Sequence, residues 1–211
     1  MRRVVVILGL LALLLPAAAW ADGIDLTNQW GTVTITAAGG IVSQGSELMS
    51  WGAIKAATGH NLGSVSFSTG SLATGSIWGG GTWNGGGTFI VRGVGAWTKN
   101  LPGTPQGPIT LFNGSFVGPV IWTVQSIGTG GFNYIFTLSG AIRGMYYDGR
   151  TVNGTTTQYI YAYTNQWLQD RKGGISLGKS NLAVPEPGTL GLLGTGLIFV
   201  AGSLRCKLLG A

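Results

Sequence analysis

Hydrophobic and polar residues alternate along much of the chain between residues 22 and 183. In the segment GTVTITA, Val33 and Ile35 alternate with threonines, and in GSVSFSTG, Val65 and Phe67 alternate with serines. Successive side chains of a β-strand point to opposite faces, so this period of two predicts strands with one buried face.

Two long alternating segments follow each other with a turn region between them. FNYIFTLSGAIRGMYY places Phe132, Tyr134, Phe136, Leu138, Ile142 and Tyr146 on one face, and TQYIYAYT places three tyrosines on one face. Asp148-Gly149 lies between them, and such a pair tolerates the positive φ angles of a tight hairpin turn. We therefore expect a long antiparallel hairpin over residues 134–163.

Turn residues separate the other alternating segments as well. Tight turns are expected at Asn84-Gly85, Asn113-Gly114 and Asn153-Gly154, because asparagine and glycine adopt positive φ readily. The stretch LPGTPQGP over residues 101–108 predicts a long loop or a seam between subdomains, and NQWLQDRK over residues 165–172 predicts one short helix.

Composition supports an all-β fold. Residues 22–183 hold 32 of the 39 glycines of the chain, and glycine is unfavourable within helices. We expect a mostly antiparallel, glycine-rich β-sandwich. A β-solenoid is the alternative, because GSIWGGGTWNGGGTFI hints at a short repeat, although a solenoid needs three or more regular repeats.

The N-terminus has the layout of a secretory signal peptide. Arg2 and Arg3 precede an apolar run over residues 4–15, and small residues stand at Ala19 and Ala21. This order of charge, apolar run and small-residue cleavage site predicts a signal peptide over residues 1–21. Export through the Sec translocon and cleavage by signal peptidase are expected, so that the mature domain covers residues 22–183.

A second apolar segment ends the chain, within residues 184–211. Residues 189–204 carry no charge, and as a helix they would extend about 24 Å, slightly less than the roughly 30 Å hydrocarbon core of a bilayer. Arg205 and Lys207 follow and should hold this end in the cytoplasm. Pro185-Glu186-Pro187 precedes the segment, and its two prolines keep the backbone extended.

Pro-Glu-Pro, a short glycine-bearing span and a basic end together resemble the sorting tail of PEP-CTERM proteins. The resemblance implies export, brief anchoring in the inner membrane by the tail, and recognition of Pro185, Glu186 and Pro187 by a membrane-embedded exosortase. Release or transfer to the cell surface would follow, often in bacteria that make abundant exopolysaccharide. The domain between the two ends resembles, more loosely, uncharacterised extracellular domains that precede such tails.

The charges and reactive residues of the mature domain argue against catalysis. Residues 22–183 contain eight Lys or Arg, five Asp or Glu, one histidine (His60) and no cysteine. No basic cluster is present that could bind nucleic acid. One histidine and no cysteine offer too few ligands for a zinc site. We expect no catalytic residues, no metal and no cofactor, with His60 as a surface turn residue.

Aromatic residues offer the one specific hypothesis about a ligand. Tyr159, Tyr161 and Tyr163 would lie about 7 Å apart along one strand face, and a row of exposed rings could stack on sugars. Uncovered rings are also expected at Trp78, Trp83 and Trp97, which lie near glycines; we favour the alternative that these aromatics fill the core or cover a sheet. Two functions follow: a non-enzymatic surface or matrix protein associated with exopolysaccharide, or a carbohydrate-binding module.

Overall fold

The computed structural model describes residues 23–52, 57–101, 107–126, 134–163 and 169–183. Twelve strands and one short 3-10 helix make up these residues. The elements are β1 (Gly23–Gln29), β2 (Thr32–Ile35), β3 (Gly40–Gly52), β4 (Ala57–Thr58), β5 (Gly63–Ser76), β6 (Gly80–Trp83), β7 (Gly86–Gly93), η1 (Ala96–Asn100), β8 (Ile109–Phe116), β9 (Val120–Ser126), β10 (Tyr134–Tyr146), β11 (Thr151–Ala162) and β12 (Lys172–Ala183).

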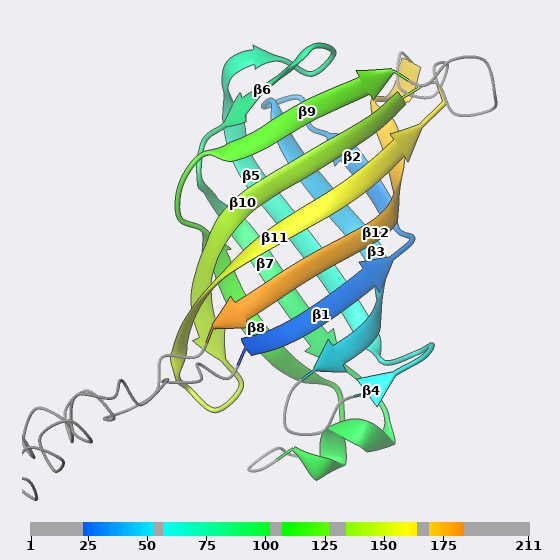
Figure 1. The fold of residues 1–211 in the computed structure, drawn as a ribbon, viewed down its shortest axis with the longest axis vertical. Coiled ribbons are helices and arrows are strands. Elements are labelled where there is room, and N and C mark those ends of the chain that lie inside the picture. Colours follow the sequence, from blue (N-terminus) through cyan, green and yellow to red (C-terminus); the bar gives the residue numbers. More distant parts are fainter. Residues whose placement is uncertain (1–22, 53–56, 102–106, 127–133, 164–168, 184–211) are drawn as a thin grey trace, which may run out of the picture. The chain divides into compact units, whose positions relative to one another are not determined.

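Several strands are halves of one longer, interrupted strand. β1 and β2 both pair with β3 and with β12, β6 and β7 both pair with β5, and β8 and β9 both pair with β10. When each of these three couples is counted as one strand, and β4, which pairs only with β3, is left aside, every strand pairs with the next one along the chain. β1 then pairs with β12 and closes the ring, and these two strands lie side by side in Figure 1.

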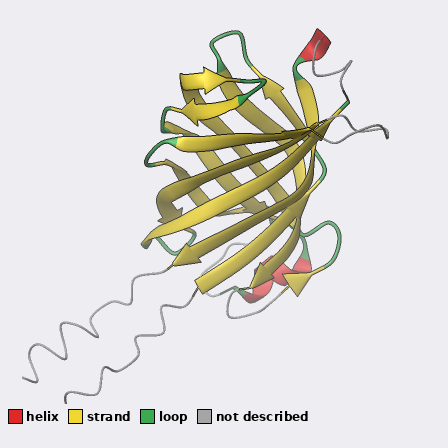
Figure 2. Cartoon of the chain, turned by 45° about the horizontal axis from the view of Figure 1, so that its top comes forward, coloured by secondary structure: helices red, strands yellow, loops and turns green. Residues whose placement is uncertain are grey.

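The all-β, antiparallel prediction is confirmed, and the sandwich is not. A sandwich consists of two sheets packed face to face, whereas the described strands belong to one sheet whose first and last strands pair. The alternative of a β-solenoid is not confirmed either, since each described pairing is antiparallel. Figure 2 shows the strands surrounding a common interior.

The hairpin predicted over residues 134–163 is confirmed. β10 and β11 pair from Tyr134↔Ala162 to Met145↔Thr151, and Gly149 at the turn has φ 86°. Three of the other expected tight turns are wrong. Asn113-Gly114 lies inside β8, and Asn153-Gly154 lies inside β11. Asn84-Gly85 joins β6 to β7, which both pair with β5 as two parts of one interrupted strand.

The glycines inside these strands have a packing role. A Cβ at Gly114 would lie 2.4 Å from the carbonyl oxygen of Arg143, and one at Gly154 would lie 2.2 Å from that of Asn181. Because such contacts are far shorter than van der Waals distance, only glycine allows the neighbouring backbone to approach this closely. Glycines that predicted turns in the sequence therefore allow close packing of neighbouring strands.

Large apolar side chains fill the interior of the closed sheet. The largest fully buried ones come from β3, β5, β6, β7, β8, β9, β10 and β1, and they include Trp51, Trp83, Trp122, Phe67, Phe89, Phe112, Phe116, Phe136, Leu26, Ile41 and Leu48. Burying one such side chain stabilises a fold by roughly 1.5–3 kcal/mol. Without a described disulfide, this packing is the main force that holds the domain together.

A polar cluster lies among these apolar residues, where β1, β3, β11 and β12 meet. Its members are buried and joined by hydrogen bonds: Asn28, Ser46, Thr156, Gln158 and Ser180. Each side chain has at least one partner, so the desolvation cost of burying it is offset.

Several predictions fall on residues that the structure does not describe. These are the signal peptide, the sorting tail, most of the loop at residues 101–108 and residues 165–168 of the helix predicted over residues 165–172; Gln169 and Asp170 are helical. Within the described ranges, no helix is long and apolar enough to cross a membrane.

Candidate functional site

Tyr159 and Tyr161 of β11, and Tyr163 directly after the strand, share the outer face of the closed sheet. Tyr159 and Tyr163 are 38% and 42% exposed, and Tyr161 is half-buried, while the alternating residues Ile160 and Ala162 are buried inside. The prediction that the tyrosines share one face is confirmed. Of the favoured alternative, that these aromatics fill the core or cover a sheet, the tyrosines fit the second part, because this register turns Gln158, Ile160 and Ala162 inward.

Tyr161 lies flat against the neighbouring strand. It pairs across β11 and β12 with Gly174, and a Cβ on Gly174 would lie 2.9 Å from both Cζ and Oη of the tyrosine. The outer end of the ring therefore occupies the space that a side chain at Gly174 would need. On the other side of β11, Ile135 of β10 pairs with Tyr161. The glycine thus allows the ring to lie along the sheet, a suitable orientation for stacking on a flat ligand.

The tryptophans expected to be uncovered differ from one another. Trp78 is 40% exposed, whereas Trp83 is completely buried and meets Trp122 edge to face. Trp97 is half-buried, and its indole Nε1 donates to the carbonyl oxygen of Leu62 at 3.0 Å. The prediction is therefore wrong for Trp83, whose side chain turns into the closed interior.

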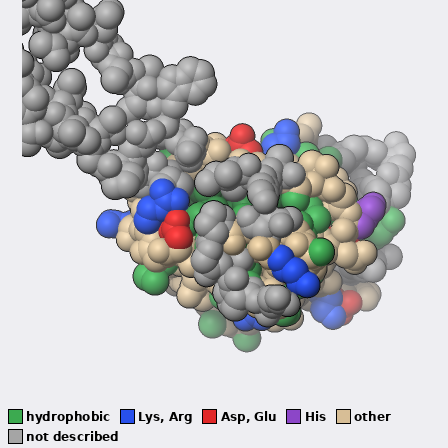
Figure 3. All heavy atoms as spheres, turned by 90° about the horizontal axis from the view of Figure 1, so that it is seen from below, with side chains coloured by type: hydrophobic (Ala, Val, Ile, Leu, Met, Phe, Trp, Pro, Cys, Tyr) green, Lys and Arg blue, Asp and Glu red, His purple; other side chains and the backbone are tan. Residues whose placement is uncertain are grey.

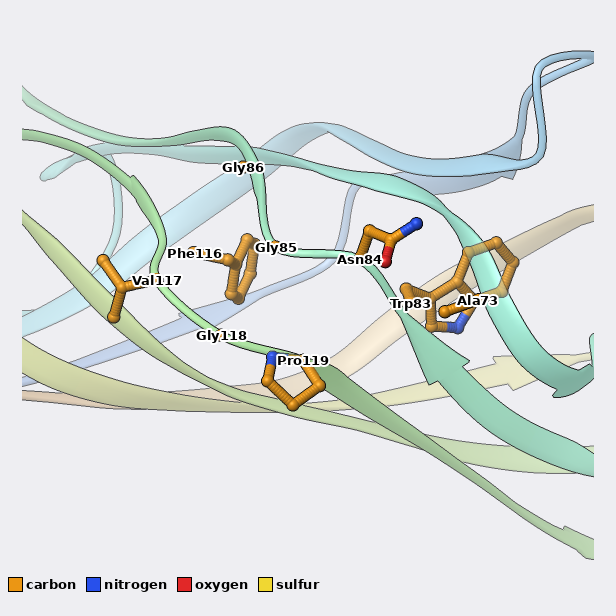
Figure 4. A pocket seen from close by; sticks show the side chains of 9 residues that line it. All are labelled: Ala73, Trp83, Asn84, Gly85, Gly86, Phe116, Val117, Gly118 and Pro119. Carbon is orange, nitrogen blue, oxygen red and sulfur yellow. The ribbon is translucent and has the colours of Figure 1, made fainter.

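A surface hollow lies where two interrupted strands run beside each other (Figure 4). It has a volume of about 380 Å³ between the β6–β7 junction and the β8–β9 junction. Its lining is uncharged: Ala73, Trp83, Asn84, Gly85, Gly86, Phe116, Val117, Gly118 and Pro119. Because none of these side chains is an acid or base, the hollow provides no proton-transfer chemistry.

The titratable groups of the described residues are dispersed. Lys and Arg side chains are scattered among uncharged ones on the face shown in Figure 3. No group of three His, Cys, Asp or Glu side chains converges on a metal-sized space anywhere in the part of the chain that the structure describes. His60 lies on the surface with 64% of its side chain exposed, as predicted, and its Nδ1 is 3.6 Å from Oε1 of Glu47.

One tyrosine has a strongly shifted pKa for structural reasons. Tyr146 is buried and stacks on Trp51 with ring centroids 6.0 Å apart. Burial, followed by the neighbouring Tyr147, raises the pKa of the Tyr146 phenol far above its ordinary value. The phenol therefore stays protonated at neutral pH, which suits a core residue and not a general base.

The predicted sorting and cleavage residues lie outside the described residues: Ala19, Ala21, Pro185, Glu186, Pro187, Arg205 and Lys207. Residues 183–205 match the family model of the PEP-CTERM protein-sorting motif. The chain carries a PEP-CTERM sorting motif. This confirms the resemblance seen in the sequence and marks the chain as an exported protein directed to an exosortase, with transient membrane anchoring through its C-terminal region.

The match covers the C-terminal tail, which begins where the last strand ends at Ala183. Comparison with curated proteins and with solved structures gives no match for the chain. The role of the closed sheet must therefore be argued from its own geometry.

The outer face of the sheet also carries a residue that the sequence reasoning missed. Trp30, between β1 and β2, is 46% exposed and stacks on His60. The available signal was a change of parity: the apolar positions Ile24 and Leu26 are even-numbered, whereas Val33 and Ile35 are odd-numbered. Such a change indicates an irregular backbone between the two strands, which the structure places at Trp30 and Gly31.

Proposed function

We propose that this chain is a non-catalytic surface or extracellular-matrix protein, processed by exosortase and associated with exopolysaccharide. The observation that carries the proposal is the sorting motif at residues 183–205, directly after the closed sheet. The filled apolar interior and the dispersed titratable groups of the described residues support a structural role. Cleavage of residues 1–21 and removal of the tail would leave the domain of residues 22–183 at the cell surface or outside the cell.

Substitutions in the sorting motif test whether exosortase processes the chain. Glu186→Ala and Pro187→Ala should leave export intact and block release from the inner membrane, because exosortase would no longer recognise the tail. Cell fractionation and intact-mass analysis of the extracellular protein measure this result. A substitution in the sheet, Met145→Ala, serves as the control, since Met145 is 59% exposed and far from the motif in sequence. Normal release of both motif variants would contradict the proposal.

A second candidate is a carbohydrate-binding module that uses the tyrosine face of β11. The exposure of Tyr159 and Tyr163 and the flat placement of Tyr161 over Gly174 favour it. Flat stacking of nucleic-acid bases on protein rings is worth roughly 1–3 kcal/mol per ring, and sugar stacking is a comparable contact. Affinity for the exopolysaccharide of the producing cells should fall in Tyr159→Ala and Tyr161→Ala, and should stay unchanged in Met145→Ala.

A further inference from the structure

A left-handed turn of the backbone at Trp30 and Gly31 takes Trp30 from the interior of the closed sheet to its outer surface. Ile24, Leu26 and Asn28 of β1 point inward, and Val33 and Ile35 of β2 point inward, so the parity changes between the two strands. In an unbroken strand, residue 30 would follow Asn28 into the core. Trp30 is instead 46% exposed, and its backbone N donates to the carbonyl oxygen of Ile175 at 2.8 Å.

The backbone around Trp30 is unusually constrained. Trp30 has φ 61°, a left-handed conformation that is uncommon for a bulky residue, and Gly31 follows with φ 80°. A Cβ at Gly31 would lie 2.4 Å from the backbone N of Ser46. Gly45, in the opposing strand, has φ 71°, and Asn61, beside His60, has φ 59°. Backbone strain that is retained in this way concentrates at functional sites.

The indole of Trp30 is supported by a polar partner set. Its ring stacks on His60 with centroids 5.4 Å apart and planes 6° from parallel. His60 Nδ1 lies 3.6 Å from Glu47 Oε1, and the same oxygen accepts a hydrogen bond from the backbone N of Asn61. This arrangement fixes an exposed ring beside a carboxylate and an imidazole, which are hydrogen-bonding groups for hydroxyls.

A hollow lies on the outer face of β2 and β3. It has a volume of about 370 Å³ and is lined by Thr32, Thr34, Thr36, Val42 and Gln44. Thr32 and Gln44 are the cross-strand pair that follows Trp30 and Gly31 along these strands. The lining is rich in hydroxyl and amide groups, and the volume falls in the range of small-molecule sites.

We propose that Trp30, His60, Glu47 and the neighbouring hollow bind a neutral polysaccharide. One sugar ring stacks on the face of the Trp30 indole that is turned away from His60, His60 and Glu47 hold the indole in place, and an adjoining unit contacts Thr32 and Gln44. The carboxylate of Glu47 would repel a phosphate-bearing or acidic polymer at the ring, and among the described residues one cation, Lys172, pairs with the lining of the hollow, opposite Thr34. The proposal deepens the matrix role by naming a ligand class and a site, and it is independent of the tyrosine face.

Titration calorimetry of the full-length protein in a mild detergent tests the site. The probes are three neutral oligosaccharides: cellohexaose, laminarihexaose and maltohexaose. Trp30→Asn removes the ring and keeps a residue that tolerates left-handed φ, so its melting temperature should match that of the unchanged protein. Trp78→Asn removes another exposed indole and is the matched control.

The unchanged protein should bind at least one probe, and Trp30→Asn should weaken that binding about tenfold, a change of 1.4 kcal/mol. Trp78→Asn should change the affinity less than about twofold. Equal affinity in Trp30→Asn, or no binding of any probe by the unchanged protein, overturns the proposal. If Tyr161→Ala alone abolishes binding, the ligand lies on the tyrosine face and this site is wrong.

Sedimentation velocity of the same variants tests whether the Trp30 ring instead contacts a second copy of the chain. A dimer that Trp30→Asn converts to a monomer would show that the ring contacts a second copy of the chain, which also overturns the proposal. The fractionation experiment on the sorting motif does not depend on any of these results. A failure of the binding site and a failure of the matrix role can therefore be told apart.

Discussion

The side-chain amides of Asn28 and Gln158 bind each other inside the closed sheet, although 130 residues separate them in the chain. Asn28 Nδ2 donates to Gln158 Oε1 at 3.0 Å, and Gln158 Nε2 donates to Asn28 Oδ1 at 3.3 Å. Asn28 lies in β1 and Gln158 in β11, and both pair with Gly178 of the intervening strand β12. The two amides meet over this glycine and join the strands on either side of it.

This amide pair stabilises the register in which the ring closes. Shifting β1 or β11 by one residue would move its amide to the outer face and bring an outward residue inside. Thr156, Ser46 and Ser180 extend the hydrogen bonds of the pair, so few other registers would satisfy the same buried groups.

Gln158→Leu should lower the free energy of unfolding by about 1–3 kcal/mol, because Oδ1 of the buried Asn28 amide loses its donor, Gln158 Nε2. Urea unfolding measures the change. In the double variant Asn28→Leu/Gln158→Leu both partners are apolar, so part of the loss should be recovered. A single variant as stable as the unchanged protein would contradict this role of the pair.

Gly178→Ala should be destabilising by about 1–3 kcal/mol, the usual cost of overpacking. The added Cβ would lie 2.1 Å from both Asn28 Oδ1 and Gln158 Oε1 and would force the amides apart. Gly118→Ala is the matched control, since nothing lies within 4 Å of a Cβ there, and its stability should change by less than about 1 kcal/mol. Thermal and urea unfolding of both variants decide the point.

Tyr161→Ala should cost less than about 1 kcal/mol of stability, close to the span of strand propensities. The ring lies on the outer face, so its removal leaves no internal cavity. Ile160→Ala is the neighbouring control: Ile160 is fully buried, and its truncation should cost about 2–5 kcal/mol. If the tyrosine variant lost as much stability as the isoleucine variant, the outward placement of the β11 tyrosines would be wrong.

Acid should weaken the β10–β11 turn through Asp148. Burial raises the pKa of Asp148, but hydrogen bonds from the side chain and backbone of Arg150 outweigh it and hold the pKa below its ordinary value. A carboxyl with a depressed pKa stabilises the fold above its unfolded pKa of about 3.9. That contribution is lost as the pH falls through the folded value.

Urea unfolding at a series of pH values below about 5 measures this dependence. The unchanged protein should lose stability more steeply with falling pH than Asp148→Asn, which has no carboxyl to protonate. Arg150→Met removes the partner, whose Nε lies 2.7 Å from Oδ2 of Asp148, and should flatten the pH dependence in the same way. Identical slopes in all three proteins would argue against the ion pair.

The sequence by itself determined the local features of this protein. The alternation around Val33, Phe67 and Phe136 determined which faces of the strands are buried, and Asp148-Gly149 determined the β10–β11 hairpin. The sorting motif was also readable, because it depends on a short run of residues in fixed order. All of these signals act between residues that are close in the chain.

Only the tertiary structure decided how the strands close on themselves. A period of two gives each strand a buried face, but it does not distinguish two packed sheets from one closed sheet. The pairing of β1 with β12, the meeting of Asn28 and Gln158, and the exposure of Tyr159 depend on residues that are distant in sequence. The left-handed backbone at Trp30 is of the same kind, because the outward turn of its ring requires the close approach of Gly31 to Ser46 in another strand.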